Sequence, residues 1–563
     1  MATRLLRRKP LWLIKQQAED QAPSTLRVYD FVSLLAVGVG GTIGSGIFVL
    51  AGTIAHAYAG PATCLSWLGA GLTCLVTALA YAELACRIPS AGSTYSFASH
   101  AAGEIFGVYG AFFLTLEYGL AGSAVARSWG DKVAYYASDL EVLGCRNDEQ
   151  GIETCWINSL GGSGVNPGAT LLCILMVSVL LGGVEMGRKA LNVLVVFKIL
   201  LVLFVIIVGA LYFDPANISP FIPDPAPDAN MVGGSHGIFL GSTIAFFGYI
   251  GFDEVACLVM EATDPHRDVP VAIIATIFII TVLYILASFV LVGMVPTASI
   301  NADEGFGSAF AYVGADWAVH IIMIGQILVV LPAVVLVSFL PQSRLQATVA
   351  IDGMLPRIFA HKASNGNFVY GVILSGIFMT LTSTFVPFHN LNDLISGGIL
   401  LSFILTNICL LFVRVQHRRQ PMILIILFVI GTALTGFATV KAWGDTLSYA
   451  FGFATLVIFV VLALVICGLD IDDKVETFRV PLVPLIPCVA IQANWFLFAQ
   501  LSSQGLVQVA VLLGAIAAAY ILFALYSTTR GGDHVRLAGS EDEDVPPHSS
   551  SATVTGVTEI ELT

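Results

Sequence analysis

The chain has 563 residues, of which 57% are hydrophobic and only 11% are charged, and its formal net charge is -13. A soluble globular domain has an apolar share of about 45 to 50%, so this composition excludes a soluble globule and indicates a polytopic membrane protein. The negative charge gives no argument for nucleic-acid binding, because the acidic residues lie mostly in loops and in the C-terminal run Glu541-Asp542-Glu543-Asp544.

Apolar segments that are long enough to cross a bilayer recur along the chain. One crossing takes about 20 apolar residues, and this criterion predicts about 14 transmembrane helices. They start near Phe31, Pro61, Ile105, Gly168, Ala190, His236, Pro270, Trp317, Phe368, Leu391, Pro421, Ser448, Pro481 and Leu506.

The cationic residues predict the orientation, because lysine and arginine near helix ends are retained on the cytoplasmic side. Cations are frequent before the first helix and in alternate loops, whereas the opposite loops hold almost only Lys132, Arg146 and Lys441. Both termini are therefore expected in the cytoplasm. Residues 528–563 are polar and are expected to form a disordered cytoplasmic C-terminal tail.

Small residues interrupt the first and the sixth apolar segments, over residues 38–46 and 241–252. Unwound backbone inside a membrane is stable only where it lines a cavity or is buried in protein. Two such broken helices in matching positions are the sequence sign of the binding site of a secondary transporter. The alternative, close packing of small residues between helices, does not require so dense a cluster twice.

Each broken helix begins a run of five, and a repeat of five helices places its second copy upside down in the membrane. We therefore predict a ten-helix transport core over residues 31–415, with a first repeat (31–213) and an inverted second repeat (236–415). Accessory helices 11 to 14 are expected over residues 421–527, and a cytoplasmic N-terminus over residues 1–30.

The unwound segments can bind both ends of an amino-acid backbone. Free N–H groups at a helix N-terminus attract a carboxylate, and free carbonyls at a C-terminus attract an ammonium group. Glycines in the first segment allow close approach to a carboxylate, and Thr42 and Ser45 add hydroxyl donors. In the sixth segment, the carbonyls of residues 246–250 are expected to accept the α-ammonium group, with Phe247 covering the substrate as a gate.

Three ionisable residues stand out inside predicted helices, where a charge costs roughly 3 kcal/mol or more. Lys198 in helix 5 is interpreted as a cation that braces the broken first helix, with snorkelling as the alternative. Glu117, near the middle of helix 3, is expected to face the cavity as a counter-charge or proton carrier, unless it is purely structural. Asp253 follows the unwound part of helix 6 and is a candidate for proton uptake or for holding that helix in place.

The outer loops carry two further candidate sites. Cys145 and Cys155 share the loop between helices 3 and 4 and are candidates for a disulfide. Asn217 begins a glycosylation sequon, which is weakened by the proline that follows it. Soluble-enzyme motifs are absent in any credible context, so the sequence predicts no enzyme, no cofactor and no metal site.

Together these motifs resemble the cationic amino acid transporter family of the amino acid-polyamine-organocation superfamily. The resemblance extends over all the predicted helices and includes the broken segments of helices 1 and 6. It also rests on Tyr81-Ala82-Glu83-Leu84, on residues 89–95, on Leu116-Glu117-Tyr118, on residues 352–356 and on Phe478-Arg479-Val480-Pro481.

The resemblance implies an all-α polytopic membrane protein with a LeuT-like 5+5 inverted repeat and about 14 transmembrane helices, in which helices 1 and 6 are discontinuous. It implies residues that bind the substrate backbone: Ile43, Gly44, Ser45 and Gly46 for the carboxylate, and the carbonyls of Phe247, Gly248 and Ile250 for the amino group. By the same similarity, Glu117 lies beside the pocket, Lys198 replaces a sodium site, and Asp253 is linked to proton coupling.

Some residues depart from the family pattern. Gly248 replaces a usual alanine, and Ala262 replaces the second of a usual pair of glutamates. Helix 8 carries Val334, Val335 and Val337, and it should border the side-chain end of the pocket. These bulky valines argue against a preference for long substrates such as arginine.

The leading hypothesis is a secondary transporter that moves L-amino acids, cationic ones such as arginine and lysine first, by alternating access. The membrane potential, a proton gradient or both would drive it, and about 100 mV contributes about 2.3 kcal/mol per charge. The alternatives are a proton-coupled symporter of neutral amino acids and, less favoured, an amino acid sensor. The expected partners are the substrate, protons and membrane lipids, and the expected location is the plasma membrane, with a vacuolar or lysosomal membrane as the alternative.

Overall fold

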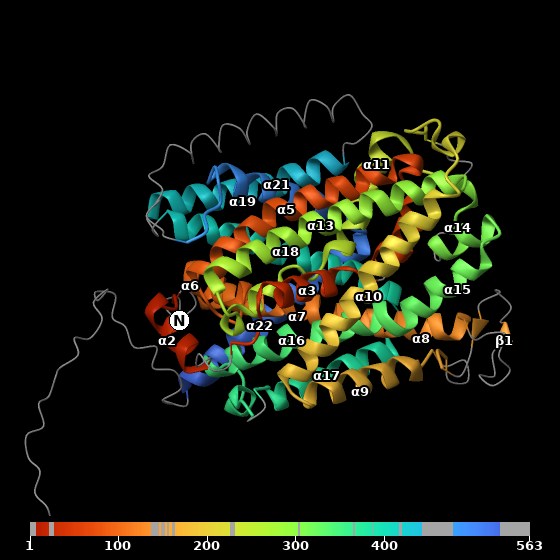
Figure 1. Cartoon of the computed structure of the whole chain (residues 1–563). Helices are drawn as coiled ribbons and strands as arrows, with labels where there is room; N and C mark the ends of the chain where they lie inside the picture. The colour runs from red at the N-terminus through yellow and green to blue at the C-terminus, as the bar shows by residue number, and fades with distance from the viewer. Residues whose placement is uncertain are drawn as a thin grey trace, which may run out of the picture.

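The computed structural model describes residues 7–21, 27–44, 46–136, 146–147, 153–154, 157–159, 164–225, 231–301, 305–363, 366–386, 388–415, 419–441 and 477–529. Long helices run lengthwise through the molecule, and the N-terminal helix α2 (Leu11–Gln21) lies at one end of them (Figure 1). A short antiparallel ladder pairs β1 (Arg146–Asn147) with β2 (Glu153–Thr154).

The first half of the chain contains α3 (Phe31–Thr42), η2 (Gly46–Leu50), α4 (Ala51–Ala57), η3 (Gly60–Ala62), α5 (Thr63–Arg87), α6 (Thr94–Ala101), α7 (Glu104–Thr115), η4 (Leu116–Leu120), α8 (Ala121–Tyr136), α9 (Pro167–Leu181), α10 (Val184–Ala210) and η7 (Pro215–Ile218). The second half contains α11 (Gly234–Ala245), η9 (Phe246–Tyr249), α12 (Glu254–Cys257), η10 (Val259–Glu261), α13 (Pro265–Met294), η11 (Thr297–Ser299), α14 (Phe306–Tyr312), α15 (Asp316–Gly325), η12 (Gln326–Val330), α16 (Leu331–Ile351), η13 (Arg357–Ala360), α17 (Val369–Phe385), α18 (Phe388–Arg414), α19 (Arg419–Lys441), α21 (Leu485–Ala499) and α22 (Ser503–Thr529).

The described residues contain 9 helical stretches that are long and apolar enough to cross a membrane, and the bent pair of α3 with η2 and α4 adds one more. Three shorter apolar helices, α9, α17 and α21, accompany them. These helices match the segments expected from the sequence, except that the segment starting near Ser448 lies outside the described residues. The polytopic all-α fold class is therefore confirmed.

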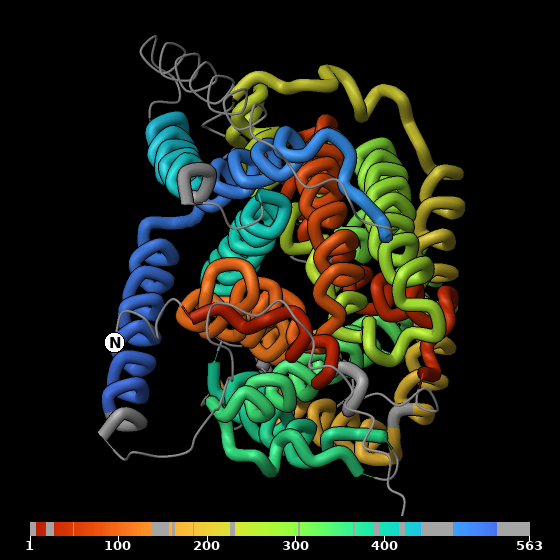
Figure 2. The backbone as a smooth tube through the Cα atoms, turned by 90° about the vertical axis from the view of Figure 1, so that its left-hand side faces the viewer, coloured from red at the N-terminus to blue at the C-terminus, as the bar shows by residue number. Residues whose placement is uncertain are grey.

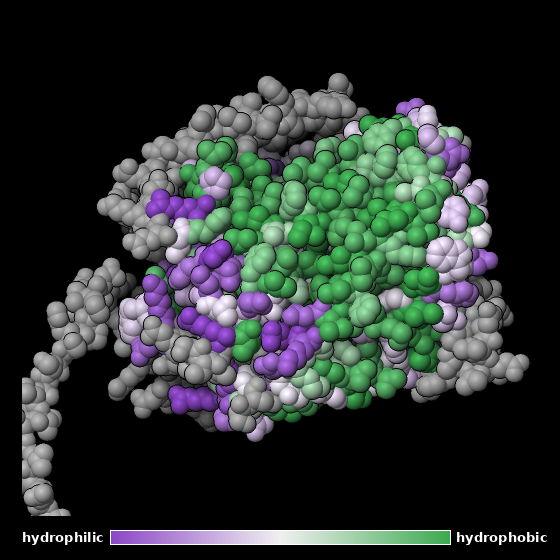
Figure 3. Space-filling view, in the orientation of Figure 1, coloured by the Kyte–Doolittle hydropathy of each residue, from purple (hydrophilic) through white to green (hydrophobic). Residues whose placement is uncertain are grey.

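The surface has the pattern of a membrane protein. On the face that Figure 3 shows, hydrophobic residues form a broad band, and hydrophilic residues gather toward its two ends. Large side chains that a soluble protein would bury are exposed, among them Val196, Ile207 and Phe278. Helices α10 and α13 carry these residues, so their outer faces suit contact with lipid tails.

Helices 1 and 6 are discontinuous, as predicted. In helix 1, α3 ends at Thr42, and the chain resumes at Gly46 with the π-helical turn η2, which leads into α4. In helix 6, the tight turn η9 follows α11, and the chain becomes extended at Ile250 before α12 begins. Both breaks lie among buried residues, as unwound backbone inside a membrane requires.

The helix contacts repeat in the two five-helix units. Helix α5 packs on α11 in the way that α13 packs on α3, and the α8–α9 contact matches the α16–α17 contact. The cross-contacts also match, since α8 packs on α17 and α16 packs on α9. The third helix of each unit contains a π-helical turn, η4 in the first and η12 in the second. This symmetry is that of the LeuT-like 5+5 inverted repeat.

The helices of the two repeated units contact one another in two groups of four. One group holds the two broken helices with α5 and α13, and the other holds the helices of α8, α9, α16 and α17. The accessory helices α19, α21 and α22 contact α18 or one another. Figure 2 shows these C-terminal helices, in cyan and blue, along one side of the molecule.

Candidate functional site

The broken segments of helices 1 and 6 cross each other at two pairs of glycines. A methyl group on Gly46 would lie 2.6 Å from the Cα of Gly248, and one on Gly251 would lie 2.8 Å from the carbonyl carbon of Gly41. A side chain at either position would collide with backbone, which cannot move aside cheaply in a packed interior. Gly251 also has a φ of +110°, which glycine alone adopts readily. The two crossings bracket residues 42–45 of helix 1.

Of the two hydroxyl groups predicted to bind substrate, the structure describes only that of Thr42. The Thr42 hydroxyl donates a 2.7 Å hydrogen bond to the carbonyl of Gly38, one turn earlier in α3. The Thr42 carbonyl accepts a 2.9 Å hydrogen bond from the Tyr284 hydroxyl of α13. Both polar groups of Thr42 are therefore already paired, while Ser45 lies outside the described residues.

Helix 8 borders the break of helix 1. A methyl group on Gly44 would lie 3.0 Å from a methyl carbon of Val334, which is buried in α16. Ile43, the residue before Gly44, is fully buried. The side of the break that faces α16 is therefore apolar.

Lys198 reaches helix 1 from α10. Its side chain is 0% exposed, and its Nζ atom donates hydrogen bonds of 2.6 Å to the carbonyls of both Gly40 and Ile43. These carbonyls have lost helical partners at the end of α3, and charge-assisted bonds from an ammonium group satisfy them. The side chain thus points inward to the break and does not snorkel to the membrane surface.

Of the predicted residues of helix 6, Phe247 lies at the break, whereas Gly248 packs against a neighbouring helix. Phe247 is buried, and its carbonyl accepts a 3.4 Å hydrogen bond from the amide of Ile250. A carbonyl has a second lone pair for another donor. Gly248 faces away from the break, because a methyl group there would lie 2.6 Å from the Trp67 ring. Trp67 in turn packs edge-on to Tyr284, with ring centroids 4.8 Å apart.

The two predicted acidic residues lie together. Glu117 in η4 and Asp253 before α12 are both buried, and their side chains are within hydrogen-bonding reach of each other. The Tyr118 hydroxyl donates a 2.6 Å hydrogen bond to Asp253 Oδ2. Neither carboxylate oxygen of Glu117 has a donor among the residues that the structure describes. The sequence placed both residues near the site but did not pair them.

Two site residues were not predicted from the sequence. Glu254 is buried with its Oε2 atom against Gly41, and Trp67 fills the space beside Gly248. The signal for Glu254 was its position next to Asp253 in a broken membrane helix, where an acidic residue is costly. No local pattern marks Trp67, since an aromatic residue in a membrane helix is ordinary.

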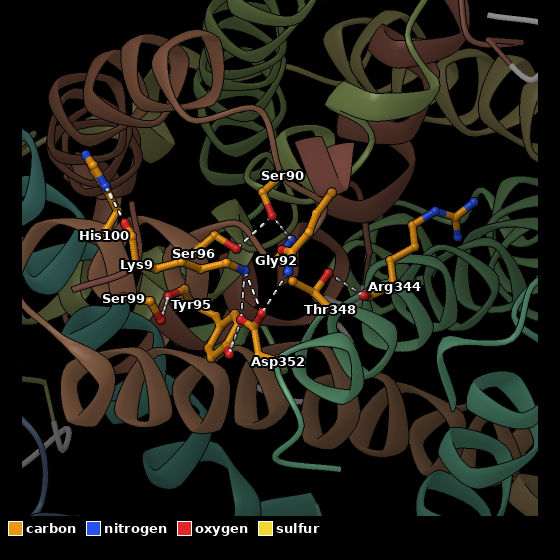
Figure 4. A network of polar contacts seen from close by, with 11 residues as sticks. Lys9, Ser90, Gly92, Tyr95, Ser96, Ser99, His100, Arg344, Thr348 and Asp352 are labelled. Carbon is orange, nitrogen blue, oxygen red and sulfur yellow. Dashed lines mark hydrogen bonds and ion pairs between the residues drawn. The ribbon is translucent and has the colours of Figure 1, made fainter. Parts of the chain in front are cut away.

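The end of the core that carries α2 is closed by an ion pair between the N-terminal segment and helix 8 (Figure 4). Lys9 Nζ lies 2.6 Å from Asp352 Oδ1 and 2.9 Å from Oδ2, and the Tyr95 hydroxyl donates to Oδ2 at 2.6 Å. The backbone of Lys9 also bonds to the Ser99 carbonyl at 3.0 Å. In the sequence, Lys9 is only one of the cations before the first helix.

Two further buried ion pairs join helices of the core. Glu261, after helix 6, pairs through both its oxygens with Arg344 of α16, at 2.7 and 2.8 Å. Glu83 of α5 pairs in the same manner with Arg414 of α18, at 2.7 and 2.9 Å. Glu83 also accepts a hydrogen bond from the backbone amide of Val480, which lies just before α21.

The α4 end of helix 1 is covered by the segment around Gly305. A methyl group on Gly52 would lie 2.6 Å from the Cα of Gly305, and Phe48 packs edge-on to Phe306 with ring centroids 6.1 Å apart. The broken helix is therefore enclosed at this end by backbone and aromatic contacts.

Of the two candidate sites in the outer loops, the structure describes only the glycosylation site. Cys145 and Cys155 lie outside the described residues, so their disulfide stays a prediction. Asn217 is described in η7, where its side-chain amide donates a 2.9 Å hydrogen bond to the Gly293 carbonyl. The side-chain nitrogen keeps one hydrogen after glycosylation, so this contact does not exclude a sugar, and glycosylation stays a prediction.

Two broken helices that cross inside a 5+5 inverted repeat define a secondary transporter with a midplane site. The family model for amino acid permeases matches residues 29–466, and that for the C-terminus of the same permeases matches residues 478–528. The chain therefore belongs to the amino acid permease family and is not an enzyme.

Similar curated proteins differ in what their names say they carry. A methylthioribose transporter of Bacillus subtilis is 34% identical over 73% of this chain and 86% of its own length. The vacuolar cationic amino acid transporter 4 of Arabidopsis thaliana is 33% identical over 73% of this chain and 67% of its own. The branched-chain amino acid permease BcaP of B. subtilis is 32% identical over 69% and 80%. The family is therefore established, whereas the substrate is not.

Proposed function

We propose that this permease moves L-amino acids across a membrane by alternating access, with cationic amino acids such as arginine and lysine as its first substrates. The observation that carries the proposal is Glu117, a buried carboxylate whose two oxygens lack a donor within the described residues. A buried carboxylate is unfavourable until a proton or a positive group neutralises it. A cationic side chain in the site would do so.

The backbone of the substrate would bind at the breaks. Backbone N–H groups at the break of helix 1 would receive the carboxylate, and the Phe247 carbonyl is an acceptor for the amino group. The Thr42 hydroxyl would not donate to the carboxylate in this conformation, because it already donates to the Gly38 carbonyl. Phe247 would cover the substrate.

Proton coupling is supported by the neighbouring acids. Glu117 and Asp253 are buried side by side, and two such carboxylates are most stable when they share a proton. A cationic substrate that approaches Glu117 would favour release of that proton. The same pair would therefore link substrate binding to proton movement, and a proton gradient would add to the membrane potential as a driving force.

Proton-coupled transport of neutral amino acids is the second candidate. Val334 faces Gly44 and makes the adjoining side of the break apolar. Such a surface suits an aliphatic side chain better than a guanidinium group. In that case, Glu117 would serve proton transfer alone.

The decisive experiment is uptake of labelled arginine and labelled leucine into proteoliposomes that contain the purified protein. An inside-negative potential is imposed with and without an inward proton gradient, and unlabelled lysine and leucine compete. Arginine uptake that lysine blocks is expected. Leucine uptake that needs the proton gradient, without any arginine uptake, would overturn the cationic assignment and support the second candidate.

We also propose that both termini lie in the cytoplasm and that the protein resides in the plasma membrane. The cation distribution supports this orientation. The N-terminal segment and the segment before α21 both bind core helices through buried ions at Asp352 and Glu83. Protease protection of an N-terminal tag in sealed cells tests the orientation, and fluorescence microscopy of the tagged protein tests the membrane.

A further inference from the structure

Glu254 is a buried carboxylate to which the transport scheme gives no role. Its side chain is 2% exposed, and its Oε2 atom has no hydrogen-bond donor among the residues described. It lies directly against helix 1, because a methyl group on Gly41 would be 2.7 Å from this oxygen. A carboxylate in such a place stays ionised only if a positive charge lies near it.

Lys198 brings a positive charge to the same stretch of helix 1. Its ammonium group binds the carbonyl of Gly40, the residue next to Gly41. A methyl group on Gly40 would meet Leu191 of α10, the helix that carries Lys198, whereas one on Gly41 would meet Glu254 of α12. The ammonium and the carboxylate therefore approach adjacent glycines from two helices, without a direct contact within 4.0 Å between them. Opposite charges in a buried, low-dielectric region attract each other beyond contact distance.

The other ionisable groups on the elements around α12 do not supply this charge. The acids among them include Asp253, Glu117 and Glu261, and the phenols are those of Tyr118, Tyr81 and Tyr284. Of the cations, Arg87 on α5 pairs with Glu83, His266 and Arg267 are exposed at the start of α13, and Arg344 lies on α16. Arg344 is bound by both carboxylate oxygens of Glu261. The acids and phenols carry no positive charge, so Lys198 is the matching cation in the described part of this region.

From this geometry we infer that Glu254 is the counter-ion of Lys198, and that the pair holds the broken end of α3 in place. Glu254 is a positioning residue, since it acts through Lys198 and its carboxylate is directed at helix 1. The inference rests on the proposed transport function and deepens it. Glu117 and Asp253 are left to exchange the proton, while Lys198 and Glu254 remain a neutral pair.

Glu254 would compensate the charge of Lys198 during alternating access. When α3 moves, the carbonyls of Gly40 and Ile43 must shift relative to the Lys198 ammonium group. A buried ammonium that lost these acceptors without a neighbouring carboxylate would be strongly destabilised. Glu254 allows Lys198 to exchange partners while remaining charged, which lowers the barrier to movement of helix 1.

The test is a double-mutant cycle on thermal stability, which needs no knowledge of the substrate. Wild type, E254Q, K198M and the double variant K198M/E254Q are purified in detergent, and their unfolding is followed by tryptophan fluorescence. K198M leaves an uncompensated buried carboxylate, so it is expected to have the lowest Tm. The double variant removes that charge and is expected to melt several degrees above K198M. Additive losses from the two substitutions would overturn the inference.

A second measurement applies if K198M does not fold. Without the Glu254 carboxylate, the charged form of Lys198 is less stable. E254Q is therefore expected to lose stability at a lower alkaline pH than wild type. E254D keeps the charge and is expected to keep the wild-type profile. Glu185→Gln is the matched control, because this glutamate is exposed on α10 and pairs with Lys189 at the surface. Identical alkaline profiles for E254Q and wild type would refute the pair.

Uptake separates this inference from the proposed function. E254Q is expected to lower uptake of whichever amino acid the wild type carries about tenfold, which is within the usual range of coupling energies between interacting residues. If the wild type moves no amino acid while the melting cycle shows coupling, the proposed function fails and the ion pair stands. If uptake is normal in the wild type and in E254Q, the proposed role in movement fails.

Discussion

Gly46 and Gly248 touch through their backbones, so that a methyl group on Gly46 would lie 2.6 Å from the Cα of Gly248. The contact joins the two broken helices at the candidate site. It depends on the absence of a side chain on Gly46, and it fixes how close helices 1 and 6 can approach.

Gly46→Ala is therefore expected to abolish uptake and to destabilise the protein by about 1 to 3 kcal/mol, the usual cost of overpacking a core. Uptake and the melting temperature of the purified variant measure the two effects. Gly307→Ala is the control, because a methyl group at Gly307 meets nothing within 4 Å. Normal uptake by Gly46→Ala would show that helices 1 and 6 can separate at this point.

Glu117→Gln is expected to lower uptake of arginine more than uptake of leucine. The substitution keeps the size of the side chain and removes its charge, so it affects a cationic substrate most. Initial rates for both labelled amino acids, corrected for the amount of reconstituted protein, measure the ratio. Equal loss for both would assign Glu117 to proton transfer and not to charge selection.

Lys9→Met is expected to release α2 from the core. The Lys9–Asp352 ion pair is buried, so removal of one partner leaves the Asp352 carboxylate without its cation and costs roughly 3 to 5 kcal/mol of local stability. Hydrogen exchange over residues 11–21 is expected to accelerate. Lys15→Met is the matched control, since Lys15 is exposed on the same helix. The exchanged pair Lys9→Asp with Asp352→Lys should restore part of the protection, and its failure to do so would contradict a simple ion-pair contact.

Asp30 caps α3, and its effect on stability depends on pH. Its carboxylate accepts a 3.0 Å hydrogen bond from the Ser33 amide, and hydrogen bonding by Ser33 lowers the pKa of Asp30. A group whose pKa is lowered by folding stabilises the fold above its unfolded value, and that contribution is lost as the pH falls through the lowered value. Asp30→Ala is thus expected to cost about 1 kcal/mol at neutral pH.

The acid dependence of this cap provides the check. The difference in melting temperature between wild type and Asp30→Ala should shrink as the pH falls below the lowered pKa of Asp30. Asp30→Asn keeps an acceptor without the charge, so its stability should vary less with acid than that of wild type. A constant difference at all pH values would show that the charge of Asp30 contributes nothing.

The β1–β2 ladder supports the predicted disulfide. Its register pairs Arg146 with Thr154 and Asn147 with Glu153, so the next pair in sequence would join positions 145 and 155. We expect these cysteines to resist alkylation until the protein is reduced, as intact-mass measurement would show. Alkylation of both without a reductant would disprove the bond.

The sequence predicted the broken helices because their cause is local. Glycines where a membrane helix should continue are visible in the chain itself, and so is a buried lysine such as Lys198. The fold followed, since a run of five helices that begins with a break, repeated once, leaves few arrangements. The contacts of α5 with α11 and of α13 with α3 agree with that expectation.

The partners of these residues could not be predicted, because they depend on which helix faces which. Glu254 is one residue from Asp253 in sequence, yet it faces Gly41 while Asp253 faces Tyr118. The sequence predicts that the Thr42 hydroxyl binds substrate, but in the structure this hydroxyl donates to the carbonyl of Gly38. Lys9 has no local signal, since its partner is 343 residues away.

The π-helical turns η4 and η12 have a consequence for the history of the chain. A π-helical turn arises when one extra residue is accommodated inside an α-helix. Here it occurs in the third helix of both units, close to Glu117 in one and at Gln326 in the other. One insertion in an ancestral five-helix gene, copied when that gene duplicated and fused, accounts for both turns with a single event. Two independent insertions would require the same accident twice.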